Sequence, residues 1–459
     1  MQSQCTGQVP SGLEQCVTST ELFDLLASAV RHATGLPDAA PRAGQARLSR
    51  DIDRVLQEGE GHVVGEAPTG VGKSIAYLVP AARLALQDQR TVVSTESLGL
   101  QHQIVEKDFP VVAGAVREAT GQDLQVAVLK GWSNFVCLAS AAEQARKQVS
   151  QDVLARVPDH GGPAQLRQGL DVLSREMAGR DSLVAWALAG DNTTGDKANY
   201  PHAMSADDWA RVSVSPAECA ESACPLFDLC FPAASRRQAA EADVVVTNHS
   251  MLAVQASKGA PVVVGSKSLG QVDAVVVDEA HALPSIVRQA GAVDVSAGSV
   301  ASVVRVLTRV VPEHDPECGE LVAQAKALSE RLTRRIEKVA VDSGGSGEKI
   351  PEGIDPLAGV GDQLQDWAKQ AAALVSSVSG GDTASQMQAR RDVARIRSLQ
   401  EALAQVRRGE IGVARWVELP DEQGAGRFGP RVPTLQLSPG GRVGCVAPQR
   451  VDHPGHRCR

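Results

Sequence analysis

The chain has 459 residues, enough for about three domains, and its hydrophobic fraction of 43% is ordinary for a globular protein. A net charge of −8 excludes a protein that coats nucleic acid through bulk positive charge, although a local basic channel is compatible with it. The chain shows no apolar run of membrane-spanning length and no signal-peptide pattern, so we expect a cytoplasmic protein, where its nine cysteines favour metal ligation over disulfides.

Short apolar runs alternate with helical patterns in the first part of the chain. A helical period over residues 20–34 predicts an amphipathic helix, and residues 74–87 have the length of a crossover helix. Five compact runs rich in valine and alanine predict strands at residues 62–65, 91–95, 126–129, 243–247 and 273–277. Continuous apolar runs are typical of strands covered on both faces, so the pattern predicts a parallel α/β sheet.

Two later regions have a different pattern. Residues 140–213 are polar, alanine-rich and helical without a strand signal, which indicates an insertion. A second helical region covers about residues 283–410, with glycine-rich joints at 343–347 and 379–381. It carries two apolar stripes with helical spacing, Leu321, Ala325, Leu328, Leu332, Ile336 and Val339, and then Val393, Ile396, Leu399, Leu403 and Val406. The simplest interpretation is that these stripes pack against each other.

A glycine-rich segment follows the first predicted strand and opens a helix. Its residues are Ala67, Pro68, Thr69, Gly70, Val71, Gly72, Lys73 and Ser74. Gly70 and Gly72 allow backbone N–H groups to face phosphates, Lys73 supplies positive charge, and the Ser74 hydroxyl suits magnesium. Ala67 stands where the strict phosphate-binding pattern has glycine. The segment predicts ATP binding with Mg²⁺.

An acidic pair follows the last predicted strand, in the sequence Asp278-Glu279-Ala280-His281. We expect Asp278 to bind magnesium through its waters and Glu279 to polarise the attacking water, which makes Lys73, Asp278 and Glu279 the candidate catalytic residues. By itself, His281 is best explained as a surface histidine at the start of a helix.

Four cysteines form the third candidate site. Cys219, Cys224 and Cys230 lie in one short stretch, and Cys137 lies far upstream. Four thiolates suit either zinc or a cubane iron–sulfur cluster, and the spacing also leaves unligated buried thiols open. The other cysteines, Cys5, Cys16, Cys318, Cys445 and Cys458, form no comparable arrangement.

These features together resemble the DinG branch of the XPD-like iron–sulfur DNA helicases of superfamily 2, over about residues 20–438. Arg42 and Gln45 resemble the element that reads adenine, and Thr95, Leu98 and Gln101 resemble the motif that contacts the DNA strand. Residues 130–137, which end at Cys137, resemble the lead into the cluster domain, and residues 242–252 resemble the return from it.

The resemblance implies a RecA-like P-loop parallel sheet with an inserted iron–sulfur domain and a helical arch domain. The expected domain ranges are 1–130 and 241–284 for the first motor domain, 131–240 for the iron–sulfur domain, 285–410 for the arch, 411–439 for a return to the motor domain, and 440–459 for an aberrant tail.

The resemblance also implies an ATP-dependent DNA helicase with a DEAH box and a role in DNA repair, moving 5′ to 3′ on single-stranded DNA. Its cofactors would be a 4Fe–4S cluster on the four cysteines, ATP and Mg²⁺, and its partners single-stranded and branched DNA. Thr95 and Gln101 would contact DNA, and His281 would link the nucleotide state to the DNA site. Candidates for the DNA path are Lys130, Trp132, Arg236 and Arg237.

Members of the family continue into a second motor domain, whereas this chain continues from residue 440 into 20 residues without periodicity, Gly440–Arg459. We therefore expect a C-terminally truncated chain, which hydrolyses ATP slowly unless a separate chain supplies the second motor domain. Three interpretations stay open: a helicase, a non-hydrolysing iron–sulfur fragment that binds DNA, and a zinc-bearing P-loop nucleotide switch.

Overall fold

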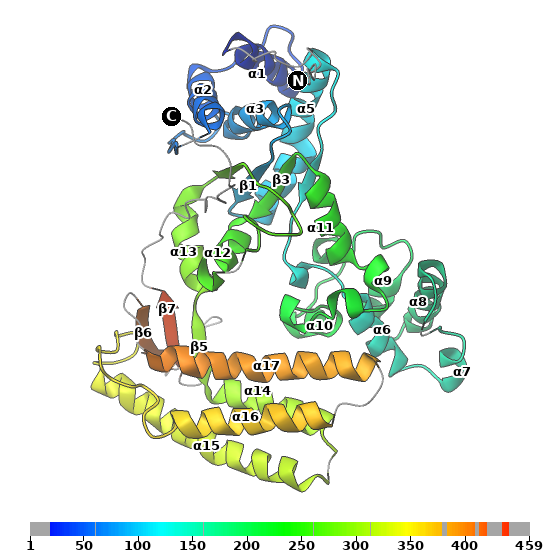
Figure 1. Ribbon diagram of the computed structural model, residues 1–459, viewed down its shortest axis with the longest axis vertical. Helices are drawn as coiled ribbons and strands as arrows, with labels where there is room; N and C mark the ends of the chain where they lie inside the picture. The colour runs from blue at the N-terminus through cyan, green and yellow to red at the C-terminus, as the bar shows by residue number, and fades with distance from the viewer. Residues whose placement is uncertain are drawn as a thin grey trace, which may run out of the picture. The chain divides into compact units, whose positions relative to one another are not determined.

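The computed structural model describes residues 19–59, 61–158, 160–259, 261–312, 314–378, 383–408, 413–419 and 434–439. The chain forms two compact units (Figure 1). Unit 1 comprises Met1–Leu129, Gln238–Asn248 and Leu269–Asp278, and unit 2 comprises Lys130–Arg237, His249–Ser268 and Glu279–Arg459. The predicted joint at 379–381, the predicted tail at 440–459 and four of the cysteines lie outside the described residues: Cys5, Cys16, Cys445 and Cys458.

Unit 1 is built on a parallel sheet with the strand order β2-β3-β1-β4. The strands are β1 (Thr91–Thr95), β2 (Val126–Val128), β3 (Val244–Asn248) and β4 (Ala274–Val277). Every residue of β1, which is paired on both sides, is buried. The parallel α/β sheet predicted from the apolar runs is therefore confirmed, with four of its five strands.

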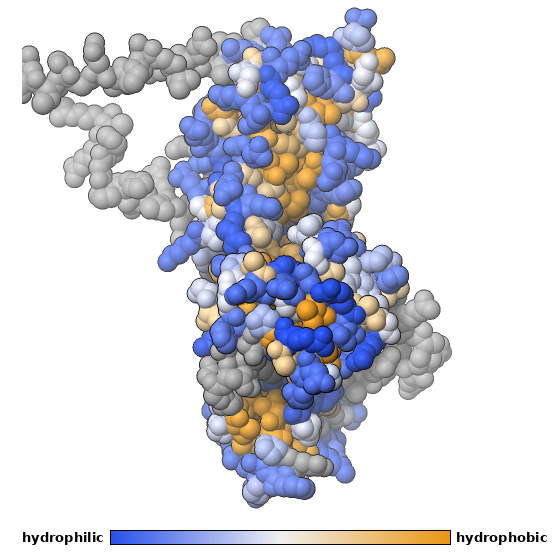
Figure 2. Space-filling view, turned by 90° about the vertical axis from the view of Figure 1, so that its right-hand side faces the viewer, coloured by the Kyte–Doolittle hydropathy of each residue, from blue (hydrophilic) through white to orange (hydrophobic). Residues whose placement is uncertain are grey.

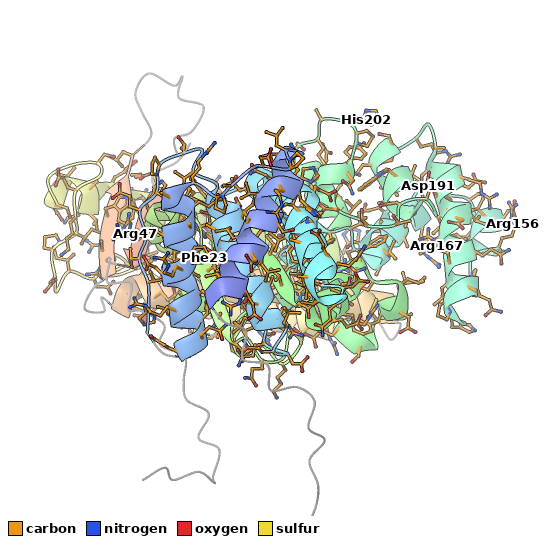
Figure 3. The ribbon with its side chains drawn as sticks, turned by 90° about the horizontal axis from the view of Figure 1, so that it is seen from above. Phe23, Arg47, Arg156, Arg167, Asp191 and His202 are labelled. Carbon is orange, nitrogen blue, oxygen red and sulfur yellow. The ribbon has the colours of Figure 1, made fainter. Side chains whose placement is uncertain are left out.

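The helices of unit 1 are α1 (Ser19–Thr34), α2 (Ala43–Glu58), α3 (Lys73–Ala85), α4 (Leu98–Gln103), a π-helical turn (Ile104–Asp108) and α5 (Phe109–Thr120). Apolar side chains of α1, α3 and α5 form one buried core with β1 and β3. The Arg50 guanidinium of α2 lies 4.9 Å from the centre of the Phe23 ring. Phe23, labelled in Figure 3, belongs to α1, so this contact joins the two helices. The helix predicted at 20–34 is confirmed.

The prediction of a strand at residues 62–65 was wrong. These residues have no regular structure and are exposed, with Val64 99% accessible to solvent. The run holds only two valines, Gly61 precedes it at φ 100°, and Gly65 is its last residue, so its own tendency to extend is weak. A strand also needs a paired neighbour, and within the described residues β4 is the edge of the sheet. The glycine-rich segment thus follows an irregular segment.

The first part of unit 2 is helical, as predicted for the insertion. Its helices are α6 (Leu138–Arg146), α7 (Gln151–Leu154), α8 (Pro163–Met177), α9 (Ser182–Leu188) and α10 (Ala206–Val212), and α11 (Phe231–Glu241) runs from unit 2 into unit 1. Helices α6, α8, α9, α10 and α11 contribute to one core that includes Leu173, Met177 and Trp209. Arg167, labelled in Figure 3, donates to the Leu188 carbonyl and ties α8 to α9.

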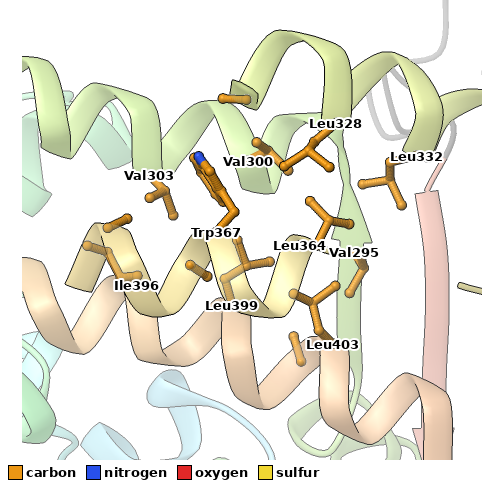
Figure 4. Packing of buried hydrophobic residues seen from close by; sticks show 14 of the residues in the cluster. Val295, Val300, Val303, Leu328, Leu332, Leu364, Trp367, Ile396, Leu399 and Leu403 are labelled. Atoms are coloured by element: carbon orange, nitrogen blue, oxygen red, sulfur yellow. The ribbon is translucent and has the colours of Figure 1, made fainter. Parts of the chain in front are cut away.

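The later part of unit 2 contains α12 (His249–Lys258), α13 (Leu283–Ala290), α14 (Ala297–Val310), α15 (Pro316–Asp342), α16 (Gly361–Ser377) and α17 (Thr383–Arg408). Both predicted apolar stripes are buried, one on α15 and one on α17, and they belong to one core (Figure 4). Trp367 of α16 lies inside this core and donates to the Leu321 carbonyl at 2.9 Å. The two stripes therefore share one core, but α15 and α17 each pack mainly against α14 and α16, so the predicted packing of the stripes directly against each other is not borne out.

A small antiparallel sheet completes unit 2, in the order β5-β7-β6. Its strands are β5 (Val293–Ser296), β6 (Val413–Glu418) and β7 (Thr434–Pro439). We expected residues 411–439 to return to the motor domain, but the two described strands of this range pair with β5, whose Val295 lies in the core of α14–α17.

Hydrophilic side chains cover much of the face in Figure 2, with apolar side chains in patches between them. Among the described residues, no helix has the length and apolarity needed to cross a membrane.

Candidate nucleotide and metal sites

The glycine-rich segment forms a turn directly before α3. Gly70 and Gly72 have φ values of 81° and 90°, in the left-handed region that glycine adopts without strain. Gly72 caps the N-terminus of α3, and Lys73 is the first helical residue. A helix N-terminus, whose first N–H groups have no partner within the helix, is suited to bind phosphates when a lysine lies beside it.

Arg42 and Gln45 of the α2 region contact this turn. The Arg42 guanidinium donates to the Gly70 carbonyl, and Gln45 Nε2 donates to the Gly72 carbonyl at 3.1 Å. Gln45 is buried, and a Cβ atom on Gly72 would lie 2.5 Å from its Nε2 atom. The two residues predicted to read adenine therefore brace the phosphate-binding turn in this structure.

Tyr77 joins the two residues that were predicted to hold magnesium, and sequence reasoning missed it. Its hydroxyl donates to Asp278 Oδ2 at 3.3 Å and also interacts with the Ser74 side chain. Burial, and then the Asp278 carboxylate, raise the pKa of Tyr77 far above its usual value, so the hydroxyl stays protonated. Helical spacing could have indicated Tyr77, because it lies three residues after Ser74 on α3 and residues at that spacing are neighbours on a helix surface.

The acidic pair lies at the end of β4. The Asp278 N–H donates to the Ser94 carbonyl at 2.9 Å, which continues the pairing of β4 with β1. Glu279 has φ 54°, an unusual conformation for a residue other than glycine. His281 Nδ1 lies 3.4 Å from Glu279 Oε2, and the His281 side chain is 76% exposed.

Of the predicted strand-contacting residues, Thr95 ends β1, and Leu98 and Gln101 lie on α4. Thr95 is buried and its hydroxyl donates to the Ser97 carbonyl at 3.1 Å, whereas Leu98 is 48% exposed. Gln101 is only 2% exposed, and both polar atoms of its side chain lack a hydrogen-bond partner within the described part of the chain. Such a group is costly to bury, which makes Gln101 the residue of this motif that most needs an explanation.

Three of the four candidate cysteines occupy equivalent backbone positions. Cys219, Cys224 and Cys230 each follow a single 3₁₀ turn, and all three have extended φ and ψ angles. Cys137 precedes α6, and its N–H donates to the Val212 carbonyl at 2.7 Å. None of the four is fully buried. The fold thus brings the distant Cys137 to the same region of unit 2 as the other three.

The thiols interact with each other and with N–H donors. Burial raises the pKa of Cys219 and Cys224, and raises the pKa of Cys230 to about 11, and the neighbouring thiols add to each shift. The Glu221 N–H donates to Cys219 Sγ at 3.3 Å, and Cys224 and Cys230 accept from the N–H groups of Leu226 and Ala233. Donors of this kind favour thiolates, the form that binds metals. As placed, however, no group of three or more metal-binding side chains among the described residues has the geometry to hold an ion.

The candidates for the DNA path differ in accessibility. Lys130 pairs with Asp196, and each side chain is only 16% exposed, so Lys130 is engaged within the protein. The Arg236 guanidinium lies 4.5 Å from the centre of the Trp132 ring, and burial lowers the pKa of Arg236. Arg237 is exposed.

Comparison with known proteins finds relatives that are all named DinG helicases. The chain is 34% identical over 313 residues to the ATP-dependent helicase DinG of Mycobacterium tuberculosis (strain ATCC 25618 / H37Rv), which is 67% of this chain and 43% of that protein. The chain is homologous to the DinG helicases. It is also 33% identical over 311 residues to the ATP-dependent DNA helicase DinG of Salmonella typhimurium, covering 66% of this chain and 41% of the relative. The Escherichia coli K12 DinG helicase matches at 32% over 258 residues, 56% of this chain and 33% of that protein.

The homology to DinG helicases, expected from the three motifs, is confirmed. The chain spans less than half the length of these relatives. No model of a known protein family matches the chain.

Proposed function

We propose that this chain carries the ATP-binding and cysteine-bearing parts of a DinG-type, ATP-dependent DNA helicase. The observation that carries the proposal is the coincidence, in a DinG homologue, of a left-handed turn at Gly70 and Gly72 with a tyrosine that joins Ser74 to Asp278. The turn offers N–H groups to phosphates, and the joined pair provides the two oxygens that suit Mg²⁺.

In this proposal ATP is held by the segment from Ala67 to Ser74. Lys73 neutralises charge on the outer phosphates, and Ser74 and Asp278 orient the hydrated Mg²⁺ ion. Glu279 follows Asp278 directly and would orient the attacking water. Arg42 and Gln45 hold the carbonyl groups of the turn, which leaves its N–H groups to face the nucleotide.

The nucleotide site is tested by binding of a fluorescent ATP analogue to the full chain. Lys73→Ala should weaken binding by at least about tenfold, because a charge-assisted contact is worth about 1.5–3 kcal/mol. Lys107→Ala, at an exposed lysine of the same unit, should leave binding unchanged. Equal binding by wild type and Lys73→Ala would overturn the site.

Helicase action is tested separately. Hydrolysis stimulated by single-stranded DNA to about 1 s⁻¹ or more, and lost in Lys73→Ala, supports a motor that works in this form. Unwinding of substrates with a 5′ or a 3′ single-stranded tail tests the proposed 5′ to 3′ direction. Nucleotide binding without stimulated hydrolysis favours the non-hydrolysing fragment.

We further propose that the four cysteines bind an iron–sulfur cluster, as the DinG resemblance implies. The donor set suits it, because Cys219, Cys224 and Cys230 share one backbone conformation and each accepts an N–H hydrogen bond. When bound, the cluster would act as a cross-link between Cys137 and the 3₁₀ turns.

Iron, sulfide and zinc analysis of protein purified without oxygen tests this cofactor. Cys137→Ser should lose iron and sulfide, whereas Cys318→Ala, at a buried cysteine of α15, should retain both. Stoichiometric zinc without iron favours the zinc-bearing nucleotide switch.

Single-stranded DNA is the proposed polymer substrate. Arg237 is exposed in the second half of α11, and Arg236 stacks on Trp132 beside it. We expect Arg237→Ala to weaken oligonucleotide binding and to lower the salt slope by about one unit. Arg156→Ala, at the outer position labelled in Figure 3, is the control. Identical salt slopes for the two variants would remove Arg237 from the DNA path.

A further inference from the structure

Arg391 of α17 reaches the first candidate cysteine. Its Nη2 atom donates to Cys137 Sγ at 3.8 Å, and its Nη1 atom donates to Ser140 Oγ at 2.5 Å. Glu143 Oε2 lies 3.9 Å from Nη1, at the outer limit of an ion pair. The Arg391 residue is only 7% exposed, so a guanidinium charge is buried at the start of α6.

Arg395 reaches the segment of the second cysteine. Its Nε atom donates to Glu218 Oε1 at 3.2 Å, and the other Glu218 oxygen accepts the Ser215 N–H at 2.7 Å. Glu218 precedes Cys219 directly. Arg391 and Arg395 are four residues apart, so they share one face of α17. One helix face therefore holds both of the cysteine-bearing segments, which lie far apart in sequence.

The surroundings of Arg391 suit a negatively charged sulfur centre better than neutral thiols. Burying a guanidinium is costly unless nearby negative charge compensates for it, and the Glu143 carboxylate lies too far away to compensate fully. The buried Nε atom of Arg391 has no hydrogen-bond partner within the described residues. Its charge also acts on Cys219 and Cys224. A metal-bound set of thiolates would supply the missing negative charge and acceptor.

We propose that Arg391 is a positioning residue for the metal–sulfur centre: it orients Cys137, and its fixed positive charge favours the reduced, more negative state of the centre. Arg395, through Glu218, fixes the segment that carries Cys219. Helix α17 is therefore linked to the oxidation state and retention of the centre. This inference rests on the proposed iron–sulfur cofactor.

The test is a redox titration of the full chain with dithionite, which supplies one electron per cluster, followed by electron paramagnetic resonance. Arg391→Gln should lower the midpoint potential by about 59 mV or more, which is a tenfold change in the ratio of reduced to oxidised centre for one electron. Arg391→Lys keeps the charge and should fall between the wild type and Arg391→Gln. Arg390→Gln, at an exposed neighbour on α17, should match the wild type.

Retention of iron against a chelator tests the holding role. Arg395→Gln should release iron several times faster than wild type at an unchanged potential, because it loses the contact to Glu218 but not the charge near the sulfurs. If Arg391→Gln fails to keep its cluster while its tryptophan fluorescence stays native, and Arg391→Lys keeps it, the positioning role is supported.

The outcomes separate the two proposals. A wild-type chain without iron and sulfide overturns the cofactor and this inference together. A wild-type chain with the cluster, and an Arg391→Gln potential equal to that of Arg390→Gln, overturns only the inference.

Discussion

The ion pair between Asp53 and Arg83 holds α2 against α3, and its loss should destabilise unit 1. Arg83 Nη1 lies 2.5 Å from Asp53 Oδ2, and the two side chains are 2% and 11% exposed. Asp53→Ala leaves a charged guanidinium buried without this carboxylate. Removing one partner of a buried ion pair costs about 3–5 kcal/mol, so we expect Asp53→Ala to lower the free energy of unfolding by about that amount.

Removing the other partner should cost less, since a carboxyl can take up a proton where a guanidinium cannot lose one. Burial raises the pKa of Asp53 above 3.8, against the opposing effect of Arg83. In Arg83→Met that opposition is gone, so the folded pKa lies further above the unfolded one. A raised folded pKa means that the protonated Asp53 carboxyl stabilises the fold. This stabilisation is fully present below pH 3.8 and is lost as the pH rises through the folded pKa. The loss of stability in Arg83→Met should therefore shrink as the pH falls toward 3.8, while that in Asp53→Ala should not. Combining Asp53→Leu with Arg83→Met should restore much of the loss, because no buried charge remains.

Hydrogen exchange of α3 amides is the appropriate assay. All five tryptophans lie in unit 2, so tryptophan fluorescence does not report on this pair. Arg117→Ala, which breaks an exposed pair with Asp123, is the control and should cost at most about 1 kcal/mol. An Asp53→Ala cost equal to that of Arg117→Ala would refute the argument from burial.

Three further predictions concern the sites. Gly72→Ala should weaken ATP binding at least about tenfold, since it adds both strain at positive φ and a clash, whereas Gly121→Ala, at φ 74° with open space around it, adds strain alone and should bind ATP normally. Tyr77→Phe should raise the Mg²⁺ concentration needed for ATP binding, because the Asp278 carboxylate loses a hydrogen-bond donor. It should also lower the stability of α3, measured by hydrogen exchange, by about 1–3 kcal/mol. An unchanged Mg²⁺ requirement would show that the tyrosine is only structural. Lys130→Met should lower the midpoint of the tryptophan unfolding transition, because it leaves the Asp196 carboxylate without its ammonium partner; an unchanged midpoint with weaker DNA binding would instead place Lys130 on the DNA path.

Much of the fold and the first outline of the sites came from local patterns. Continuous apolar runs predicted four strands of the parallel sheet, and helically spaced ones predicted both buried stripes, because each element must bury the side chains that its own geometry places toward the core. The prediction of a strand at residues 62–65 was wrong, because a strand is stable only when a neighbouring strand pairs with it, and a short run of residues does not show whether such a neighbour exists.

The sequence by itself determined which residues are chemically suited to phosphate, magnesium and metal–sulfur binding, since those properties belong to Gly70, Lys73, Asp278 and the four cysteines as residue types in short segments. Only the tertiary structure decided which side chains support them. Tyr77 meets Asp278, and Arg391 meets Cys137, across long stretches of chain. Such contacts depend on how whole helices pack, and no local pattern records that.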